Sequence, residues 1–386
     1  MHSCLIEIVD TVKIIVVRKN VKKIKKEIIY VSIVGSVFFA LSLFAWLKPV
    51  NEFSATERRK LAIFPELTTD TIKSGLFMEK FETYTLDQFP FRDAFRTIKA
   101  FTHKYVLGQS DNNNVYLADG FVSKLDFPYR KKATQRAVTK FNWIYETLIK
   151  ESGAFVYYAI IPDKNFFLAE KNGYPSMDYQ QLYADMQTGL EGTMTYIEIA
   201  DLLEIEDYYY TDTHWKQECI TDVAKRLAEG MGTQLDLEYE TVTLKHPFYG
   251  VYYGQLGLPI QPDSISYLKH PIFDECKIYD YQNEKNIPMY RMDLAKGRDA
   301  YEMYLSGSLS VITIENPNAK TDKELVLFRD SFGSSIAPLF AEAYAKITLL
   351  DIRYLNQTMI QNFVTFEKQD VLFLYSTGVL NNQSAF

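Results

Sequence analysis

Two short segments of this sequence contain the residue types that nucleophilic catalysis needs. The first is Asp212-Thr213-His214-Trp215, which precedes a predicted helix. In an extended segment, residues two positions apart project from the same face, so the Asp212 carboxylate can hold and polarise the His214 imidazole as a general base. Alternatively, Asp212 caps the following helix and His214 is an ordinary histidine.

The second segment, residues 325 to 335, is an apolar strand that runs into a turn and then into a helix. Ser331 lies where α/β folds place nucleophiles, because free backbone N–H groups at a helix start can bind an oxyanion. The alternative is a helix cap formed by Asp330, Ser331, Ser334 or Ser335. Both segments occur in one chain with few other histidines, which favours a triad of Ser331, His214 and Asp212.

The elements that would position these residues alternate between strands and helices. The apolar, β-branched run at 154–161 is typical of a parallel strand buried on both faces. Similar runs follow at 194–199, 311–314, 324–328, 347–352 and 371–375, with helical patterns at 132–151, 216–231, 334–345 and 357–366. The alternation predicts an α/β sandwich with a mostly parallel sheet. Residues 233–300 lack this rhythm and are expected to form an insertion or lid.

The amino-terminal part predicts a membrane anchor. Residues 28–47 contain no charge over 20 positions, about the length that crosses a ~30 Å hydrocarbon core. Residues 1–27 carry a net charge of +4, so this end is expected in the cytoplasm and the rest outside it. A cleaved signal peptide is the alternative. Residues 48–68 are expected to be a linker, and residues 69–386 an extracytoplasmic domain.

Composition excludes several classes of protein. The chain has 386 residues, of which 47% are hydrophobic, so it is too apolar for disorder. Its three cysteines form no zinc motif or disulfide framework, although Cys219 and Cys276 could pair. We expect no metal site and no cofactor, because no other cluster of His, Asp and Glu has ligand spacing. The net charge of −7 becomes −11 without residues 1–27, which is a poor match to nucleic acid.

Three motifs carry a resemblance to a known family. They are D-T-H-W at 212–215, R-D-S-F-G at 329–333 and D-I-R-Y at 351–354. They resemble the DHHW family of Gram-positive bacteria, which is related to the alginate O-acetylation proteins of the AlgJ and AlgX type. Residues 57–93 resemble the segment that precedes the domain in that family, with Arg58 where an asparagine is common. The resemblance implies an SGNH-hydrolase-like three-layer α/β/α sandwich.

The same resemblance implies roles for individual residues. Ser331 would be the nucleophile, His214 the general base and Asp212 its orienting carboxylate. Arg353 would bind substrate or an acyl intermediate, or form an ion pair with Asp351. A Gly-Asn pair is replaced by Ser306-Gly307-Ser308, so the Gly307 N–H or the Ser308 hydroxyl would complete the oxyanion site, together with Gly333.

The implied activity is O-acetyl transfer to a cell-surface or secreted polysaccharide, by a single-pass protein of the cell membrane whose carboxyl-terminal domain is extracellular. A multispanning membrane protein would supply the acetyl group. A carbohydrate acetylesterase would use the same three residues. The remaining alternative is a catalytically inactive envelope protein that binds polysaccharide through its 28 tyrosines and 26 phenylalanines.

Overall fold

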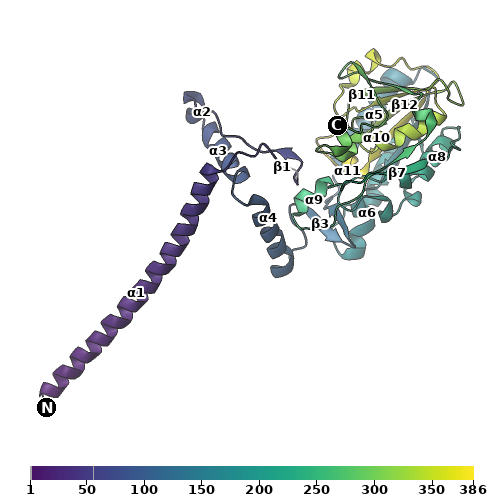
Figure 1. The fold of residues 1–386 in the computed structure, drawn as a ribbon. Coiled ribbons are helices and arrows are strands. Elements are labelled where there is room, and N and C mark those ends of the chain that lie inside the picture. The colour runs from purple at the N-terminus through teal and green to yellow at the C-terminus, as the bar shows by residue number, and fades with distance from the viewer. Residues whose placement is uncertain (1, 55) are drawn as a thin grey trace. The chain divides into compact units, whose positions relative to one another are not determined.

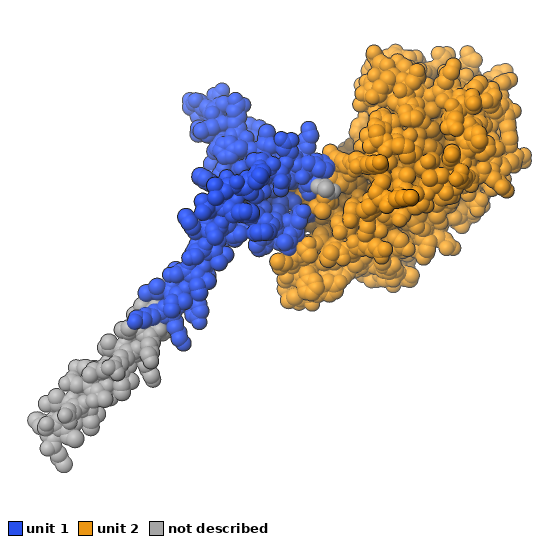
Figure 2. Space-filling model, in the orientation of Figure 1, with its two compact units in different colours: residues 1–54, 60–96 blue, residues 55–59, 97–386 orange. Residues whose placement is uncertain are grey.

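The computed structural model describes residues 2–54 and 56–386, with side chains from Lys25 onward. Most of the basic residues expected on the cytoplasmic side, such as Lys13 and Arg18, therefore have side chains outside the described residues. The chain divides into two compact units, residues 1–54 with 60–96 and residues 55–59 with 97–386 (Figure 2). We describe each unit by itself.

The first unit contains the long helix α1 (His2–Leu47). One segment of it, Lys25–Leu47, is long and apolar enough to cross a membrane, with a mean hydropathy of 2.3 and no burial inside the protein. This segment includes the predicted span at 28–47. Helices α2 (Thr69–Lys73) and α3 (Leu76–Asp87) belong to the same unit, which also contains the start of α4 (Arg92–Phe101).

The residues expected to form a linker, 48–68, pack on α3 instead. The Gln88 side-chain amide donates hydrogen bonds to the carbonyl oxygens of Asn51 and Ala62, at 2.8 and 3.0 Å. The Phe64 ring meets the rings of Phe77, Phe81 and Tyr84 edge to face. The boundary expected at residue 69 is therefore wrong, because aromatic packing joins the two sides of it. Strands β1 (Phe53–Ser54) and β2 (Arg59–Lys60) form a small hairpin in this segment.

The second unit is built on an eight-stranded sheet in the order β10-β9-β11-β13-β12-β14-β5-β6 (Figure 1). Strands β13, β12, β14, β5 and β6 run parallel, whereas β11, β9 and β10 are antiparallel to their neighbours. The bounds are β5 (Phe155–Ile161), β6 (Thr195–Tyr196), β9 (Lys277–Asp280), β10 (Lys285–Ile287), β11 (Val311–Glu315), β12 (Glu324–Arg329), β13 (Lys346–Leu350) and β14 (Asp370–Ser376).

The central sheet lies between two hydrophobic cores, each covered by helices, and this gives the second unit its three layers. Side chains alternate along β12, so Leu325 and Leu327 enter one core and Val326 and Phe328 the other. The first core contains α8 (Thr221–Gly230) and the 3-10 helix 337–342, and the second contains α5 (Lys131–Ile144) and α7 (Tyr179–Leu190). The predicted α/β/α sandwich is confirmed. Shorter elements are β3 (Val115–Ala118), β4 (Phe121–Lys124), α6 (Lys164–Leu168), α10 (Gly333–Ile336) and α11 (Thr377–Leu380).

Residues 233–300 form no separate insertion. Strands β7 (Glu240–Thr243) and β8 (Ser266–Lys269) form their own two-stranded sheet, and helix α9 (Val251–Leu256) lies between them in sequence. However, β9 and β10 extend the central sheet through β11, which corrects the expectation for this region. Ile278 and Ile287 are buried and supply the apolar face that binds these edge strands to the core. Cys219 and Cys276 are both free thiols.

Candidate active site

Ser331 lies directly after the carboxyl end of β12, in the turn that leads to α10. The carboxylate of its neighbour Asp330 accepts the Phe332 N–H at 3.0 Å. Its second oxygen accepts both the backbone N–H and the hydroxyl of Ser376, at 2.8 and 2.7 Å. Because Ser376 ends β14, Asp330 fastens the turn to the adjacent strand. Asp330 thus links the end of β12 to the end of β14 by hydrogen bonds, and is not only a helix cap.

Gly333 is required where the turn passes its own strand. A Cβ atom at this position would lie 2.5 Å from the Cβ of Arg329, a distance that packed side chains do not reach. The Arg329 side chain is fully buried and donates to the carbonyl oxygens of Gly307 and Leu309. The turn therefore passes close to the buried Arg329 side chain, which only a glycine at position 333 allows. This close passage places Ser331 at the end of the strand.

The structure brings Asp212, His214 and Ser331 together. His214 Nδ1 lies 2.6 Å from Asp212 Oδ1, and His214 Nε2 lies 2.7 Å from Ser331 Oγ. The carboxylate can only accept, so Nδ1 carries the proton and Nε2 is free to accept from the serine hydroxyl. This tautomer is the one a general base needs to deprotonate Ser331. The three groups form one continuous line of hydrogen bonds.

Asp212 is almost completely buried, yet three groups keep it ionised. Burial by itself would raise the pKa of this carboxyl, but the charge and hydrogen bond of His214 outweigh it. Arg58 Nη1 at 3.1 Å from Oδ2 and the Val251 N–H at 2.8 Å act in the same direction. Together they hold the pKa of Asp212 well below its usual range, so the carboxylate is charged at any physiological pH.

Stacking against Tyr301 fixes the plane of the His214 imidazole. The Tyr301 ring stacks on the His214 ring, with centroids 3.7 Å apart and planes within 6°. The Tyr301 hydroxyl and the Trp215 indole N–H both donate to Ser335 Oγ, at 2.8 and 2.9 Å. Ser335, a possible helix cap from sequence, therefore holds the ring that orients the histidine.

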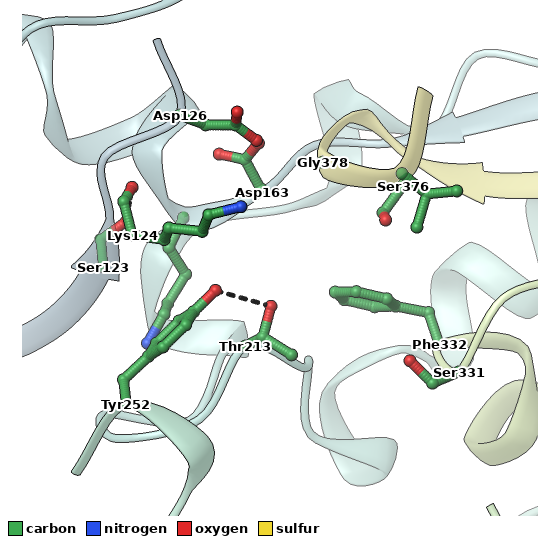
Figure 3. Close-up of a pocket in the computed structure, with 12 residues that line it drawn as sticks. Ser123, Lys124, Asp126, Asp163, Thr213, Tyr252, Ser331, Phe332, Ser376 and Gly378 are labelled. Atoms are coloured by element: carbon green, nitrogen blue, oxygen red, sulfur yellow. Dashed lines mark hydrogen bonds between the residues drawn. The ribbon is translucent and has the colours of Figure 1, made fainter. Parts of the chain in front are cut away.

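Ser331 opens into a cavity of about 160 Å³ (Figure 3). Ser331, Phe332 and Thr213 lie on one side, and the carboxylates of Asp126 and Asp163 face each other on the opposite side. Burial, and then the charge of Asp126, raise the pKa of Asp163 to about 6. The remaining lining residues are Ser123, Lys124, Lys164, Tyr252, Ser376, Gly378 and Val379. The volume is enough for several waters, so a small acyl group fits within it.

The three residues assigned to oxyanion binding are otherwise engaged or absent from this cavity. The Gly307 N–H donates to the Tyr304 carbonyl at 2.9 Å, in a tight turn where Gly307 has a φ of 73°. The Gly333 N–H donates to the Asp330 carbonyl at 3.0 Å. Ser308 is exposed and does not belong to the cavity lining. The assignment of these residues to oxyanion binding therefore stays a prediction, although both glycine amides already donate within turns.

The amide of Ser331 itself is the better oxyanion candidate. Within the part of the chain that the structure describes, the Ser331 N–H has no hydrogen-bond acceptor, whereas the next three amides all donate within the turn. An unused N–H on the nucleophile is close to any carbonyl that the Oγ atom attacks.

Arg353 forms the ion pair that was the alternative to substrate binding. Its Nε and Nη2 atoms donate to the two oxygens of Asp351 at 2.9 and 2.6 Å. Asp351 is also 3.8 Å from Arg329, so one buried carboxylate serves two arginines. The arrangement stabilises the strand ends near Ser331, and Arg353 does not line the cavity. Among the described residues, no group of three or more His, Cys, Asp or Glu side chains is arranged to hold a metal ion.

Comparisons with known proteins agree with this architecture. No family model matches the sequence, and no curated protein matches it. A solved DHHW family protein from Eubacterium siraeum is 20% identical, with a TM-score of 0.58 over 71% of this chain and 94% of that one. PatB1 from Bacillus cereus is 19% identical, with a TM-score of 0.57 over 70% of this chain and 98% of that one.

The chain has the fold of these two proteins. A second PatB1 structure, which carries a sulfonyl adduct, is 19% identical with a TM-score of 0.55, over 70% of this chain and 97% of that one. The likeness to the DHHW-type fold covers about the length of the second unit, and the motifs at 212–215 and 329–333 lie in that unit. The resemblance seen in those motifs is therefore matched at the level of the fold.

Two residues that shape the site were not predicted from the sequence to belong to it. Tyr301 is one tyrosine among many in a region without regular periodicity. Arg58 lies in a charged segment far from the motifs, at a position with a φ of 55°, and it is only 8% exposed. It bridges Asp212 and Asp299. An arginine preceding a predicted domain gives no indication that it reaches a buried carboxylate inside that domain.

Replacing Arg58 tests its contribution to the site around Ser331. In Arg58→Ala we expect kcat for an activated acetate ester to fall about 10- to 100-fold, since loss of one buried charge-assisted hydrogen bond costs about 1.5–3 kcal/mol. Without the cation the pKa of Asp212 rises, so the acid limb of the pH–rate profile moves to higher pH. Arg58→Lys should recover part of the loss. Arg59→Ala, next in sequence and half-exposed, is the control, and equal effects of the two alanine variants would contradict this role.

The buried Lys164 side chain leads us to expect a second pH effect, this time on the stability of the folded protein. Its ammonium is buried and donates to the carbonyl oxygens of Tyr209 and Tyr210, at 2.9 and 3.2 Å. Burial lowers its pKa from 10.5 to about 7. Between these values the unfolded chain binds the proton that the folded chain releases, so this group makes stability rise with pH. We expect the urea midpoint to increase between pH 7 and 9, and Lys164→Met to reduce that increase. An unchanged slope in the variant would show that Lys164 is not its source.

Proposed function

We propose that this protein is a membrane-anchored O-acetyltransferase that acts outside the cytoplasm on a polysaccharide. The observation that carries the proposal is the line of hydrogen bonds from Asp212 through His214 to Ser331, at 2.6 and 2.7 Å. Further support comes from the DHHW-type fold, the resemblance of the two motifs, and a cavity of acetyl size beside the serine. Ser331, His214 and Asp212 form the catalytic triad in this proposal.

The reaction would proceed in two acyl transfers. His214 Nε2 takes the proton of Ser331 as Oγ attacks the acetyl carbonyl carbon, and the same proton goes to the departing donor group. The product is an acetyl-serine. A sugar hydroxyl then attacks that carbonyl while His214 accepts its proton, and the proton returns to Ser331 Oγ as the sugar ester leaves. The Ser331 N–H stabilises the oxyanion in both steps.

The amino-terminal helix supports the proposed location. Lys25–Leu47 is long enough to span the hydrocarbon core, and the basic residues before it favour a cytoplasmic amino terminus. The catalytic unit would then face outward as a single-pass protein. Because acetyl donors are made in the cytoplasm, a multispanning membrane partner that passes acetyl groups across the bilayer completes the proposal.

The first test is acetylation of the protein itself. Full-length protein in detergent is treated with p-nitrophenyl acetate and examined by intact mass and peptide mapping. We expect one acetyl group on Ser331, and none in His214→Ala. Adding sugar acceptors separates the alternatives, since transfer to sugar supports a transferase and hydrolysis alone an acetylesterase. A folded protein without an adduct would instead support a catalytically inactive, polysaccharide-binding role.

A further inference from the structure

A second and larger groove lies beside the segment that carries the triad. It has a volume of about 810 Å³ and lies in the second unit. Its lining comes from the β3–β4 hairpin, the 210–218 segment and the loop before β8. The smaller cavity beside Ser331 uses the far end of the same hairpin, at Ser123 and Lys124, and the same segment at Thr213. The groove and the cavity are therefore built on shared elements.

The groove presents a flat aromatic surface. The Tyr210 side chain is 45% exposed and stacks on Phe121, with ring centroids 4.5 Å apart. Lys216 Nζ lies 5.4 Å from the Tyr210 ring centroid and donates to the Glu206 carbonyl. Phe121 thus packs on one face of the ring and Lys216 Nζ lies over it, while 45% of the Tyr210 side chain stays exposed to a ligand.

The groove also contains an unused hydrogen-bond acceptor. Glu218 lines it, and Glu218 Oε2 is buried without a hydrogen-bond partner among the described residues. A buried carboxylate oxygen without a donor is costly unless a ligand or water supplies one. By contrast, the other carboxylate of the groove, Asp263, is satisfied by the backbone of Tyr210 and Thr211 and by the Thr211 hydroxyl. Glu218 is therefore the carboxylate of the groove that has an acceptor oxygen left for a hydrogen bond from a ligand.

We propose that this groove binds a stretch of neutral glycan and that Tyr210 and Glu218 are its main recognition groups. A sugar ring has an apolar C–H face for the tyrosine and hydroxyl donors for the carboxylate. The groove lining carries one cation, Lys216, and two carboxylates, Glu218 and Asp263, and this small net negative charge disfavours a polyanion. Tyr210 is bonded to the backbone of β4, through its carbonyl and the Val122 N–H at 2.8 Å, so the platform is rigid.

The inference rests on the proposed function for its ligand class, and it assigns the acceptor chain to this groove. Ser123 at the cavity is three positions after Gly120 at the groove, about 10 Å along a strand. A polysaccharide held in the groove would thus extend toward Ser331 along the hairpin. Such a chain gains affinity from several sugar rings in the groove, which is about five times larger than the cavity beside the serine.

The test measures polymer binding separately from acetylation. Surface polysaccharide is extracted from the source cells, stripped of O-acetyl groups with mild base and embedded in a native gel, and retardation of the full-length protein gives the affinity. We expect Tyr210→Ala and Glu218→Ala each to lower the affinity at least tenfold, and Tyr210→Phe to remain within about twofold of wild type. The control is Tyr105→Ala, because Tyr105 is 60% exposed and packs against the Phe101 ring but lies outside the groove.

Each outcome decides one of the two proposals. Retardation that depends on Tyr210 and Glu218 supports the groove, even if Ser331 is never acetylated, in which case only the proposed catalysis fails. Acetylation of Ser331 in wild-type protein with no retardation, or with equal retardation of the Tyr210→Ala and Tyr105→Ala variants, overturns the groove and leaves the catalysis intact.

Discussion

Ser331→Ala is expected to abolish the acetyl-enzyme and to lower the rate of acetyl transfer by about 10⁶-fold, the magnitude known for loss of a serine nucleophile. The loss is this large because His214 and Asp212 act only through the serine oxygen. Stopped-flow release of p-nitrophenol measures it, since the rapid first turnover reports formation of the acyl-serine. The burst should disappear completely, while the melting temperature stays within a few degrees of wild type.

Ser308→Ala is the matched control for this experiment. Ser308 is an exposed serine that does not line the cavity, so its replacement should leave the burst within twofold of wild type. A burst that persists in Ser331→Ala would mean that another residue carries the acetyl group. In that case the hydrogen-bonded line from Asp212 to Ser331 would have a structural role only.

Asp212→Asn is expected to lower kcat by about 10⁴-fold with little change in KM. Arg58 and the Val251 N–H are both donors and retain the amide oxygen, so the asparagine N–H₂ group faces Nδ1 of His214. Nδ1 must then accept, which places the ring proton on Nε2. That proton faces Ser331 Oγ at 2.7 Å, where the base must accept. The shape of the site is nearly unchanged, so the variant isolates the effect of the carboxylate charge from the effect of packing.

The comparison for Asp212→Asn is Asp222→Asn on α8, whose side chain is 78% exposed. It should retain wild-type kcat. The pH dependence adds a second readout, because a carboxylate with a pKa held well below its usual range stays ionised throughout the accessible range in wild type. A loss of less than tenfold in Asp212→Asn would show that Arg58 and Tyr301 orient the imidazole without it.

The sequence was most informative where structure is periodic. Continuous apolar runs predicted the buried strands β5, β12, β13 and β14, because a strand covered on both faces needs apolar residues at every position. The edge strands β9 and β10 were missed, since strands this short, with Lys277, Asp280 and Lys285, resemble loops. The helix expected at 334–345 is mainly 3-10, because Pro338 lacks the N–H that an α-helix interior uses.

The residues of the site also fall into two groups, those that the sequence predicted and those that it did not. Asp212, His214 and Ser331 could be proposed because each lies in a short motif at the edge of a periodic element. The neighbours that tune them come from irregular segments: Tyr301 from a 3-10 turn and Arg58 from the segment before the second unit. No local pattern connects such residues to the site. The oxyanion assignments stay predictions for a related reason, since whether an amide is free depends on turn geometry that residue types do not determine.

The position of Arg58 sets a boundary for any soluble form of this protein. Residues 55–59 belong to the second unit, although the chain on both sides of them belongs to the first. A protease that cuts before residue 55 would release the catalytic unit with its arginine attached, whereas a cut after residue 59 would leave Asp212 and Asp299 without their shared cation. Two fragments that differ by only a few residues at their start would therefore differ in whether Asp212 keeps its cation, and under the proposed function they would differ in activity.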